Sequence, residues 1–228
     1  MQRYELGLAA LDAAMGQEPM IYAFSPITMI SPGGYPAVAY FQNRSSTEDV
    51  DVIIDPEHAV DKDVATAIRN TMKQVGEDLL FGRKWINEDV SMFLTPQARQ
   101  SLFQDATKQN IVLWDGPHLR VLAAPLEWGL ETKLRRLSTT PNHPKVVSDM
   151  NDIVVILKFL IDRNGAPLKQ NTIQSLNRNG FDVAIKDDVI KKAQQNTKHN
   201  MERSLSAKGQ LDQMSGLTTR DTQLICTT

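Results

Sequence analysis

The sequence predicts an α/β (α+β) fold in which helices flank a small mixed β-sheet and a helical segment follows at the C-terminal end. Residues 49–55, DVDVIID, alternate between two faces with the side-chain period of two that is typical of a strand. Residues 111–114 and 119–123 predict two more short strands, joined by the turn Asp115-Gly116-Pro117. Residues 61–80 place apolar side chains at helical spacing between charged ones, which predicts an amphipathic helix.

The first elements are set by local composition and turn residues. Residues 6–15 have the apolar spacing of a helix, and Gly16 is expected to end it. Residues 20–30, MIYAFSPITMI, are rich in β-branched and aromatic side chains and predict an extended segment. A turn at Ser31-Pro32-Gly33-Gly34 follows, and the apolar side chains of residues 37–41 predict a short helix after it.

Later elements are marked by proline and by helix-capping residues. Residues 81–99 predict a loop. Pro125 suits the first position of a helix over residues 126–137, and Ser148 suits the N-cap of a helix over residues 148–162.

The C-terminal region differs in composition from the rest of the chain. Residues 163–228 are rich in Gln, Asn, Lys, Ser and Thr and have few aromatic side chains. We expect residues 1–162 to form one domain and residues 163–228 to form a helical appendage, with a helix near residues 187–195. The last 20 or so residues are expected to be mobile.

Overall composition narrows the function classes. The chain has 228 residues, 41% hydrophobic and 23% charged, with a formal net charge of -2, which excludes a collagen-like or wholly disordered protein and a protein that holds nucleic acid by overall charge. Cys226 is the single cysteine, so an internal disulfide or a cysteine-rich zinc site is excluded and a reducing, cytoplasmic location is expected. No window is long and apolar enough to predict a membrane span or a signal peptide.

Two aspartates on the predicted strand are the first candidates for chemistry. Asp49 and Asp51 project from the same face, about 7 Å apart along the backbone. Two carboxylates this close resist joint ionisation unless a cation lies beside them, and hard oxygen ligands suit Mg²⁺ or Mn²⁺. Gly33 and Gly34 in the preceding turn would let backbone N–H groups approach a phosphate. The structural alternative is an acidic pair on an exposed strand face and a glycine pair that only makes a turn.

The order of these residues adds a family resemblance. The chain runs from a strand through Gly-Gly and a helix to an Arg-x-x-Thr-x-Asp-x-Asp run, which resembles the nucleotidyltransferase-like superfamily, closest to the abortive-infection toxin nucleotidyltransferases and their uncharacterised relatives. The segments WINEDV, LAAPLEWGLETKLRRL and SDMNDI are similar to further motifs of that branch, so the resemblance covers roughly residues 25–162. It implies a nucleotidyltransferase-like fold, Mg²⁺ or Mn²⁺, a nucleoside triphosphate substrate, and nucleotide-binding residues Gly33, Gly34, Arg44 and Thr47.

Helical geometry singles out a lysine and an aspartate independently. Lys133 lies at the edge of the apolar face of its predicted helix, and Asp149 lies on the apolar face of the next helix. Because a buried charge without a partner is costly, we expect the two side chains to meet each other, a ligand or another partner. A site-lining role for Lys133 stands beside the alternative that its amine reaches solvent. Asp152 is interpreted as a carboxylate that favours the N-terminal end of its helix.

The number of acids leaves the function open between classes. The resemblance implies a third carboxylate on a neighbouring strand, but residues 118–124 offer Arg120 and no acid, which leaves Asp115 and Asp89 as substitutes from loops. The first hypothesis is transfer of a nucleoside monophosphate from an NTP to a hydroxyl of RNA, protein or a small molecule, with Asp49, Asp51 and Lys133 as catalytic residues and Asp149 and Asp115 in support. The alternatives are a catalytically silent, antitoxin-like binding or regulatory protein and a purely structural relic.

Overall fold

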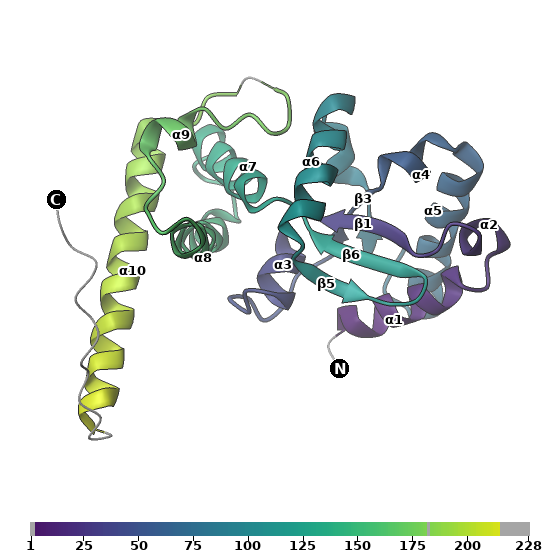
Figure 1. Ribbon diagram of the computed structural model, residues 1–228, viewed down its shortest axis with the longest axis horizontal. Coiled ribbons are helices and arrows are strands. Elements are labelled where there is room, and N and C mark those ends of the chain that lie inside the picture. Colours follow the sequence, from purple (N-terminus) through teal and green to yellow (C-terminus); the bar gives the residue numbers. More distant parts are fainter. Residues whose placement is uncertain (1–2, 182, 215–228) are drawn as a thin grey trace.

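The computed structural model describes residues 3–181 and 183–214, which form two lobes placed side by side (Figure 1). The sheet lobe, residues 3–124, contains α1 (Arg3–Met15), α2 (Pro19–Tyr22), β1 (Ile27–Ser31), α3 (Gly34–Ala39), β2 (Val50–Asp51), β3 (Ile53–Ile54), α4 (Pro56–Val60), α5 (Lys62–Asp78), β4 (Ile86–Asn87), the 3-10 helix η1 (Asp89–Phe93), α6 (Pro96–Gln109), β5 (Val112–Asp115) and β6 (Leu119–Ala123). The helical lobe, which begins after Pro125, contains α7 (Leu126–Thr139), α8 (Val146–Asn164), α9 (Gln170–Gln174) and α10 (Asp187–Met214).

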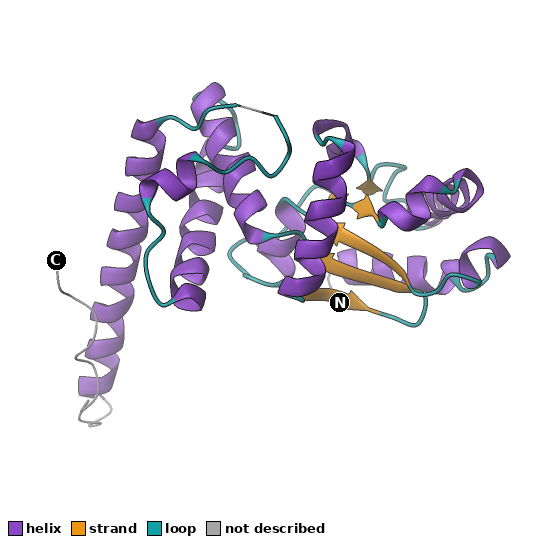
Figure 2. Ribbon diagram, turned by 45° about the horizontal axis from the view of Figure 1, so that its top comes forward, coloured by secondary structure: helices purple, strands orange, loops and turns teal. Residues whose placement is uncertain are grey.

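The main sheet has four strands in the order β3-β1-β6-β5. Strands β1 and β6 are parallel, whereas β3 and β5 are antiparallel to their neighbours, so the sheet is mixed. The strand predicted over residues 49–55 is divided at Val52: β3 joins the main sheet, while β2 pairs in parallel with β4 and places Asp51 opposite Asn87. The predicted combination of helices with a small mixed sheet is therefore confirmed, and Figure 2 shows the strands enclosed by helices.

Each face of the main sheet has its own apolar core. Met29 of β1 lies in the core against α1 and α5, and the next residue, Ile30, lies in the core against α6, as the strand period requires. The alternation expected after Asp49 is also found, because Val52 and Ile54 lie in the first core and Ile53 lies in the second. The first core therefore fixes the backbone on either side of Asp51, through Val50 and Val52.

Several sequence expectations need correction. The segment 20–30 begins as a helix instead of extended chain, because Pro19 starts α2 and the Glu18 carboxylate accepts a hydrogen bond from the Met20 N–H. The predicted loop contains β4, η1 and the start of α6, whose N-cap Thr95 accepts a hydrogen bond from the Ala98 N–H.

One predicted helix start is confirmed and another is displaced. Helix α7 begins at Leu126, with Pro125 as its N-cap instead of its first residue. Helix α8 begins at Val146 with Lys145 at the N-cap, and Ser148 instead donates a hydrogen bond to the Lys145 carbonyl, so Ser148 is not the N-cap.

The C-terminal helices pack on the two helices that precede them. A third apolar core joins side chains of α7, α8, α9 and α10, so packing groups residues beyond 163 with α7 and α8. The predicted helix near residues 187–195 is confirmed as the start of α10. Cys226 and most of the last 20 residues lie outside the described part of the chain. Among the helices of residues 3–181 and 183–214, none combines the length and apolar character needed to cross a membrane.

Candidate active site

The Gly33-Gly34 bend lies directly against the predicted Arg-x-x-Thr-x-Asp-x-Asp run. Gly33 has φ +80° and ψ -131°, a conformation that side chains other than glycine's rarely allow, and a Cβ placed there would lie 3.1 Å from Oδ2 of Asp51. A Cβ on Gly34 would lie 2.3 Å from Oγ1 of Thr47. Both positions therefore need glycine, and the bend presents backbone without side chains beside the Asp51 carboxylate.

The Asp51 carboxylate is partly buried, and few interactions offset its negative charge. Among the described residues, its carboxylate accepts no hydrogen bond and has no ion-pair partner, while Ser31 Oγ donates to its backbone carbonyl at 2.7 Å. Burial, followed by repulsion from Asp49, raises the pKa of Asp51 to about 6. Such a carboxylate is favoured by any cation that binds beside it.

Asp49 and β4 complete the acidic side of the site. The Asn87 amide donates to Oδ2 of Asp49 at 3.2 Å, and Oδ1 of Asn87 accepts from the Asp89 N–H at 3.0 Å. Asp89 also contributes to the raised pKa of Asp51, although Lys84 Nζ lies 2.8 Å from its carboxylate. Asn87 thus holds one acid of the pair and links it to the segment that carries Asp89.

Lys133 is buried in an ion-pair cluster of the helical lobe. Its Nζ lies 2.8 Å from Oδ2 of Asp152 and 3.7 Å from Oδ1 of Asp149, and its side chain is 7% exposed. The expected meeting of Lys133 with Asp149 is therefore found, and Arg136 adds a second cation to Asp149 at 3.1 Å. Lys133, Asp152 and Gly33 line one narrow cavity between the lobes.

Asp152 is the centre of this cluster, which corrects its interpretation as a residue of the helix N-terminal end. It lies in the second turn of α8, where its carboxylate forms ion pairs with Lys133 and with the guanidinium of Arg44. The Asn43 amide also donates a hydrogen bond to its Oδ1 at 2.9 Å. Burial opposes its ionisation, but Lys133 and Arg44 outweigh burial, so the pKa of Asp152 is lowered. Arg44 therefore joins the sheet lobe to the helical lobe through a two-point contact.

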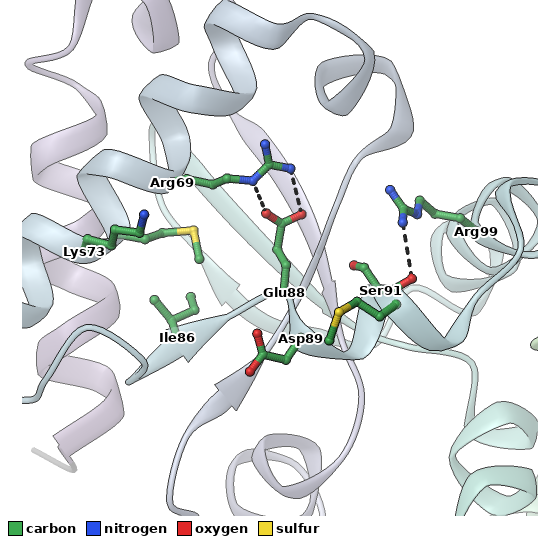
Figure 3. A pocket seen from close by; sticks show the side chains of 9 residues that line it. Arg69, Lys73, Ile86, Glu88, Asp89, Ser91 and Arg99 are labelled. Carbon is green, nitrogen blue, oxygen red and sulfur yellow. Dashed lines mark hydrogen bonds and ion pairs between the residues drawn. The ribbon is translucent and has the colours of Figure 1, made fainter.

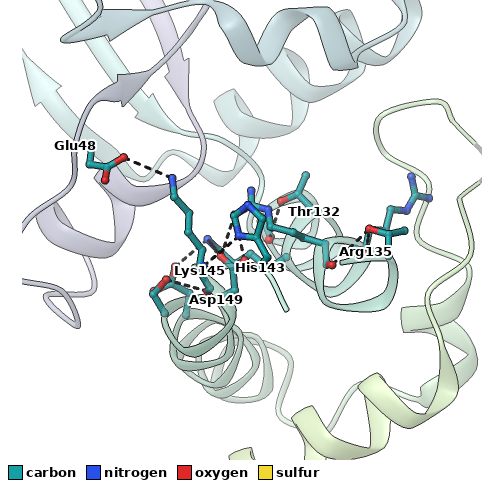
Figure 4. Close-up of polar contacts among 12 residues, drawn as sticks. Glu48, Thr132, Arg135, His143, Lys145 and Asp149 are labelled. Atoms are coloured by element: carbon teal, nitrogen blue, oxygen red, sulfur yellow. Dashed lines mark hydrogen bonds and ion pairs between the residues drawn. The ribbon is translucent and has the colours of Figure 1, made fainter. Parts of the chain in front are cut away.

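Basic side chains of the helical lobe face the aspartate pair. Lys145 and Arg136 both act to lower the pKa of Asp51, against the larger effect of burial. Lys145 extends from the start of α8 toward the sheet lobe, where its Nζ lies 3.9 Å from Oε2 of Glu48 (Figure 4). The space beside Asp51 is thus bounded by carboxylates on one lobe and by cations on the other.

The structure brings most of the predicted site residues together and leaves one apart. Gly33, Gly34, Thr47, Asp49 and Asp51 form one group, and Arg44, Lys133 and Asp149 form a second group through Asp152.

Asp115 lies elsewhere. It pairs with Arg120, at the end of β6 opposite to the end that adjoins Ser31, and its Oδ1 lies 3.6 Å from Arg120 Nε. The position of Asp115 therefore does not support its expected role in the site. Sequence reasoning overlooked Asn43 and Asn87, and only the position of Asn87 within the WINEDV segment could have drawn attention to it.

The donor set fits a hard divalent cation in part. Within the part of the chain that the structure describes, no group of three or more His, Cys, Asp or Glu side chains could hold a metal ion. Mg²⁺ is, however, commonly held by one or two carboxylates together with phosphate oxygens of the substrate. Asp49 and the uncompensated Asp51 supply such a pair, so the residues present fit Mg²⁺ that arrives with a nucleotide.

Comparisons of the chain with protein-family models, with curated proteins and with solved structures found no match.

Proposed function

We propose that the chain is a metal-dependent nucleotidyltransferase-like protein that transfers a nucleoside monophosphate from an NTP to a hydroxyl acceptor and releases pyrophosphate. The observation that carries this proposal is the Asp51 carboxylate, which is partly buried, lacks a compensating partner among the described residues, and lies against the Gly33 backbone beside Asp49. A fold that leaves such a charge uncompensated loses stability, and strained or uncompensated groups of this kind concentrate at functional sites.

Each residue has a role that follows from its surroundings. Asp49 and Asp51 would hold Mg²⁺ or Mn²⁺, and the ion would supply neutralisation of phosphate charge and activation of the attacking hydroxyl. The Gly33-Gly34 backbone lets a triphosphate approach the acid pair without steric conflict. Thr47 lies against Gly34, where its hydroxyl can contact the same phosphates.

The ion-pair cluster supplies positive charge from the other lobe. It contains three cations, Lys133, Arg44 and Arg136, and two carboxylates, Asp149 and Asp152, so three minus two leaves one net positive charge. Lys133 stabilises charge that develops on the transferred phosphate, since positioning and electrostatics provide most of the rate enhancement in phosphoryl chemistry. Asp149 holds Lys133 in place in this proposal. Arg44 contacts the nucleotide by exchanging Asp152 for a phosphate.

Transfer of label from radiolabelled NTPs tests the proposal. With Mg²⁺ and a mixture of RNA, protein and small-molecule hydroxyl acceptors, Asp51→Asn is expected to reduce transfer by about 100-fold or more. Asp115→Asn makes the same chemical change at the exposed, remote carboxylate and is expected to leave transfer unchanged. Equal transfer by the wild type and Asp51→Asn, or no transfer by the wild type with any acceptor, would count against the enzyme.

One observation favours a second candidate, a catalytically silent nucleotidyltransferase-fold protein with a binding or regulatory, antitoxin-like role. That observation is the lack of a third acidic ligand among the described residues. Calorimetric titration with NTPs and Mg²⁺ separates the two, because the enzyme must show metal-dependent nucleotide binding and the silent protein need not. A cytoplasmic location, expected from the single cysteine, belongs to the same proposal.

A further inference from the structure

A second cavity opens beside the acid pair, on the sheet lobe. It has a volume of about 340 Å³ and is lined by α5, by the segment that follows β4, and by the first turn of α6. Figure 3 shows its basic side chains, with Arg69 and Arg99 on opposite sides of Glu88 and Ser91. Asp89, which is linked through Asn87 to Asp49, forms part of the wall.

Two buried polar atoms in this wall have no partner among the described residues. Ser91 Oγ and Arg99 Nε are both shielded from solvent and make no hydrogen bond, whereas Arg99 Nη2 donates to the Ser91 carbonyl at 3.3 Å. Buried donors left without a partner destabilise a fold, so each calls for an explanation such as a ligand. Both atoms can donate a hydrogen bond to an anionic oxygen.

The charge that remains in the cavity is positive. Glu88 is neutralised by Arg69, whose Nε lies 2.5 Å from Oε2, and Asp89 is paired with Lys84. Lys73 and Arg99 form no ion pair within the described chain and therefore carry the uncompensated charge. A phosphodiester offers the oxygens and the charge that this arrangement lacks.

Exposed apolar side chains continue the wall of the cavity. Met92, which lines the cavity, is 75% exposed, and the next residue of η1, Phe93, is 64% exposed. Cations interleaved with an exposed aromatic ring are the combination that holds single-stranded nucleic acid, in which bases stack on the ring while phosphates meet the cations. A free phosphate or an acidic side chain would make no use of the exposed ring.

We propose that this cavity, through Lys73, Arg99 and Ser91, binds a phosphate of a single-stranded RNA acceptor whose terminal hydroxyl is presented to Asp49 and Asp51. The inference rests on the proposed function and names its acceptor. The segment from Asn87 to Phe93 then serves both sites, since Asn87 positions Asp49 and the following residues form the RNA surface.

Fluorescence anisotropy of a short labelled single-stranded RNA, in EDTA and without NTP, tests this assignment on the full chain. Lys73→Gln and Arg99→Gln are compared with Lys62→Gln on α5 and Lys108→Gln on α6, which remove the same charge from the same two helices outside this cavity. The double variant Lys73→Gln/Arg99→Gln is expected to bind RNA about tenfold more weakly at about 50 mM salt. Its salt slope should fall by about 1.4, at about 0.7 for each single-strand phosphate contact.

Separate outcomes decide the source of the phosphate and the fate of each proposal. Lys73 makes no hydrogen bond or ion pair with the residues that the structure describes, so a loss of binding by Lys73→Gln alone, with unchanged circular dichroism, supports the site independently of Arg99. Absence of RNA binding by the wild type, or equal weakening by the Lys62 and Lys108 variants, would overturn the RNA site. Displacement of RNA by inorganic phosphate at equal phosphate concentration would assign the cavity to a free anion instead. Nucleotidyl transfer to another acceptor would survive each of these failures, because the binding assay contains neither metal nor NTP.

Discussion

Replacing Asp51 by Asn is expected to stabilise the fold at neutral pH, although Asp51 is a proposed catalytic residue. Burial and the neighbouring Asp49 raise the pKa of Asp51 from its ordinary value of 3.8 to about 6. Between these two pH values the folded state binds more protons than the unfolded state, so stability falls as pH rises through this window and stays low above pH 6. An amide cannot ionise, and the variant therefore escapes this loss.

The magnitude follows from the two pKa values. The difference between about 6 and 3.8, at about 1.4 kcal/mol for each pH unit, gives an upper bound of about 3 kcal/mol. Asp51 is only partly buried, and solvent screening reduces the expected gain to about 1–2 kcal/mol. For a protein of this length, that gain corresponds to a rise in Tm of about 2–8 °C.

Urea unfolding followed by circular dichroism measures the effect, with Asp115→Asn as the matched control. At about pH 7.5 the Asp51→Asn variant should be the most stable of the three proteins, and most of its advantage should disappear at about pH 4. A variant that is no more stable than the wild type at about pH 7.5 would refute the reasoning. It would show that the Asp51 carboxylate is already compensated in the folded protein.

Two further predictions concern the ion-pair cluster and the glycine bend. Lys133→Met should lower the free energy of unfolding by about 2–3 kcal/mol, below the 3–5 typical of breaking a buried pair, because each carboxylate keeps an arginine. Urea unfolding checks this value against Lys62→Met at an exposed position, and equal stability of the two would contradict it. Gly33→Ala should cost about 1–3 kcal/mol, measured by thermal unfolding, because its φ and ψ suit only glycine. Gly165 also has a positive φ, +69°, but it lies in the left-handed helical region that other residues can adopt, and a Cβ there meets open space. Gly165→Ala should therefore cost less than Gly33→Ala, and the reverse order would be inconsistent with strain at the bend.

Local patterns were sufficient for much of the fold. The period of two in residues 49–55 and the helical period in residues 61–80 each indicate which face meets a core, and the structure buries those faces. Helix α6 was missed because its buried face carries only two large apolar side chains, Leu102 and Phe103, beside Ala98 and Ala106. Strand β4 was missed because two residues are too few to show any period.

The site was predictable only where its residues are close in sequence. The bend and the Arg-x-x-Thr-x-Asp-x-Asp run lie within two dozen residues, and the structure brings them into contact. The role of Asp152 depends on Arg44, 108 positions away, and on a lysine of another helix. Such a pairing is a product of packing between lobes, and no local spacing reports it.

Within residues 3–181 and 183–214 the chain passes between the lobes once, at Pro125, and this has a mechanical consequence. Because the segment of Asp51 is anchored by the cores of the sheet lobe and Lys133 by the core of α7 to α10, the two groups of the site come together only through an intramolecular association of two separately supported halves, as in the contact of Arg44 with Asp152. The short tether sets a high effective concentration for that association. Inserting flexible residues beside Pro125 would lower this effective concentration, while the apolar cores of both lobes stayed intact.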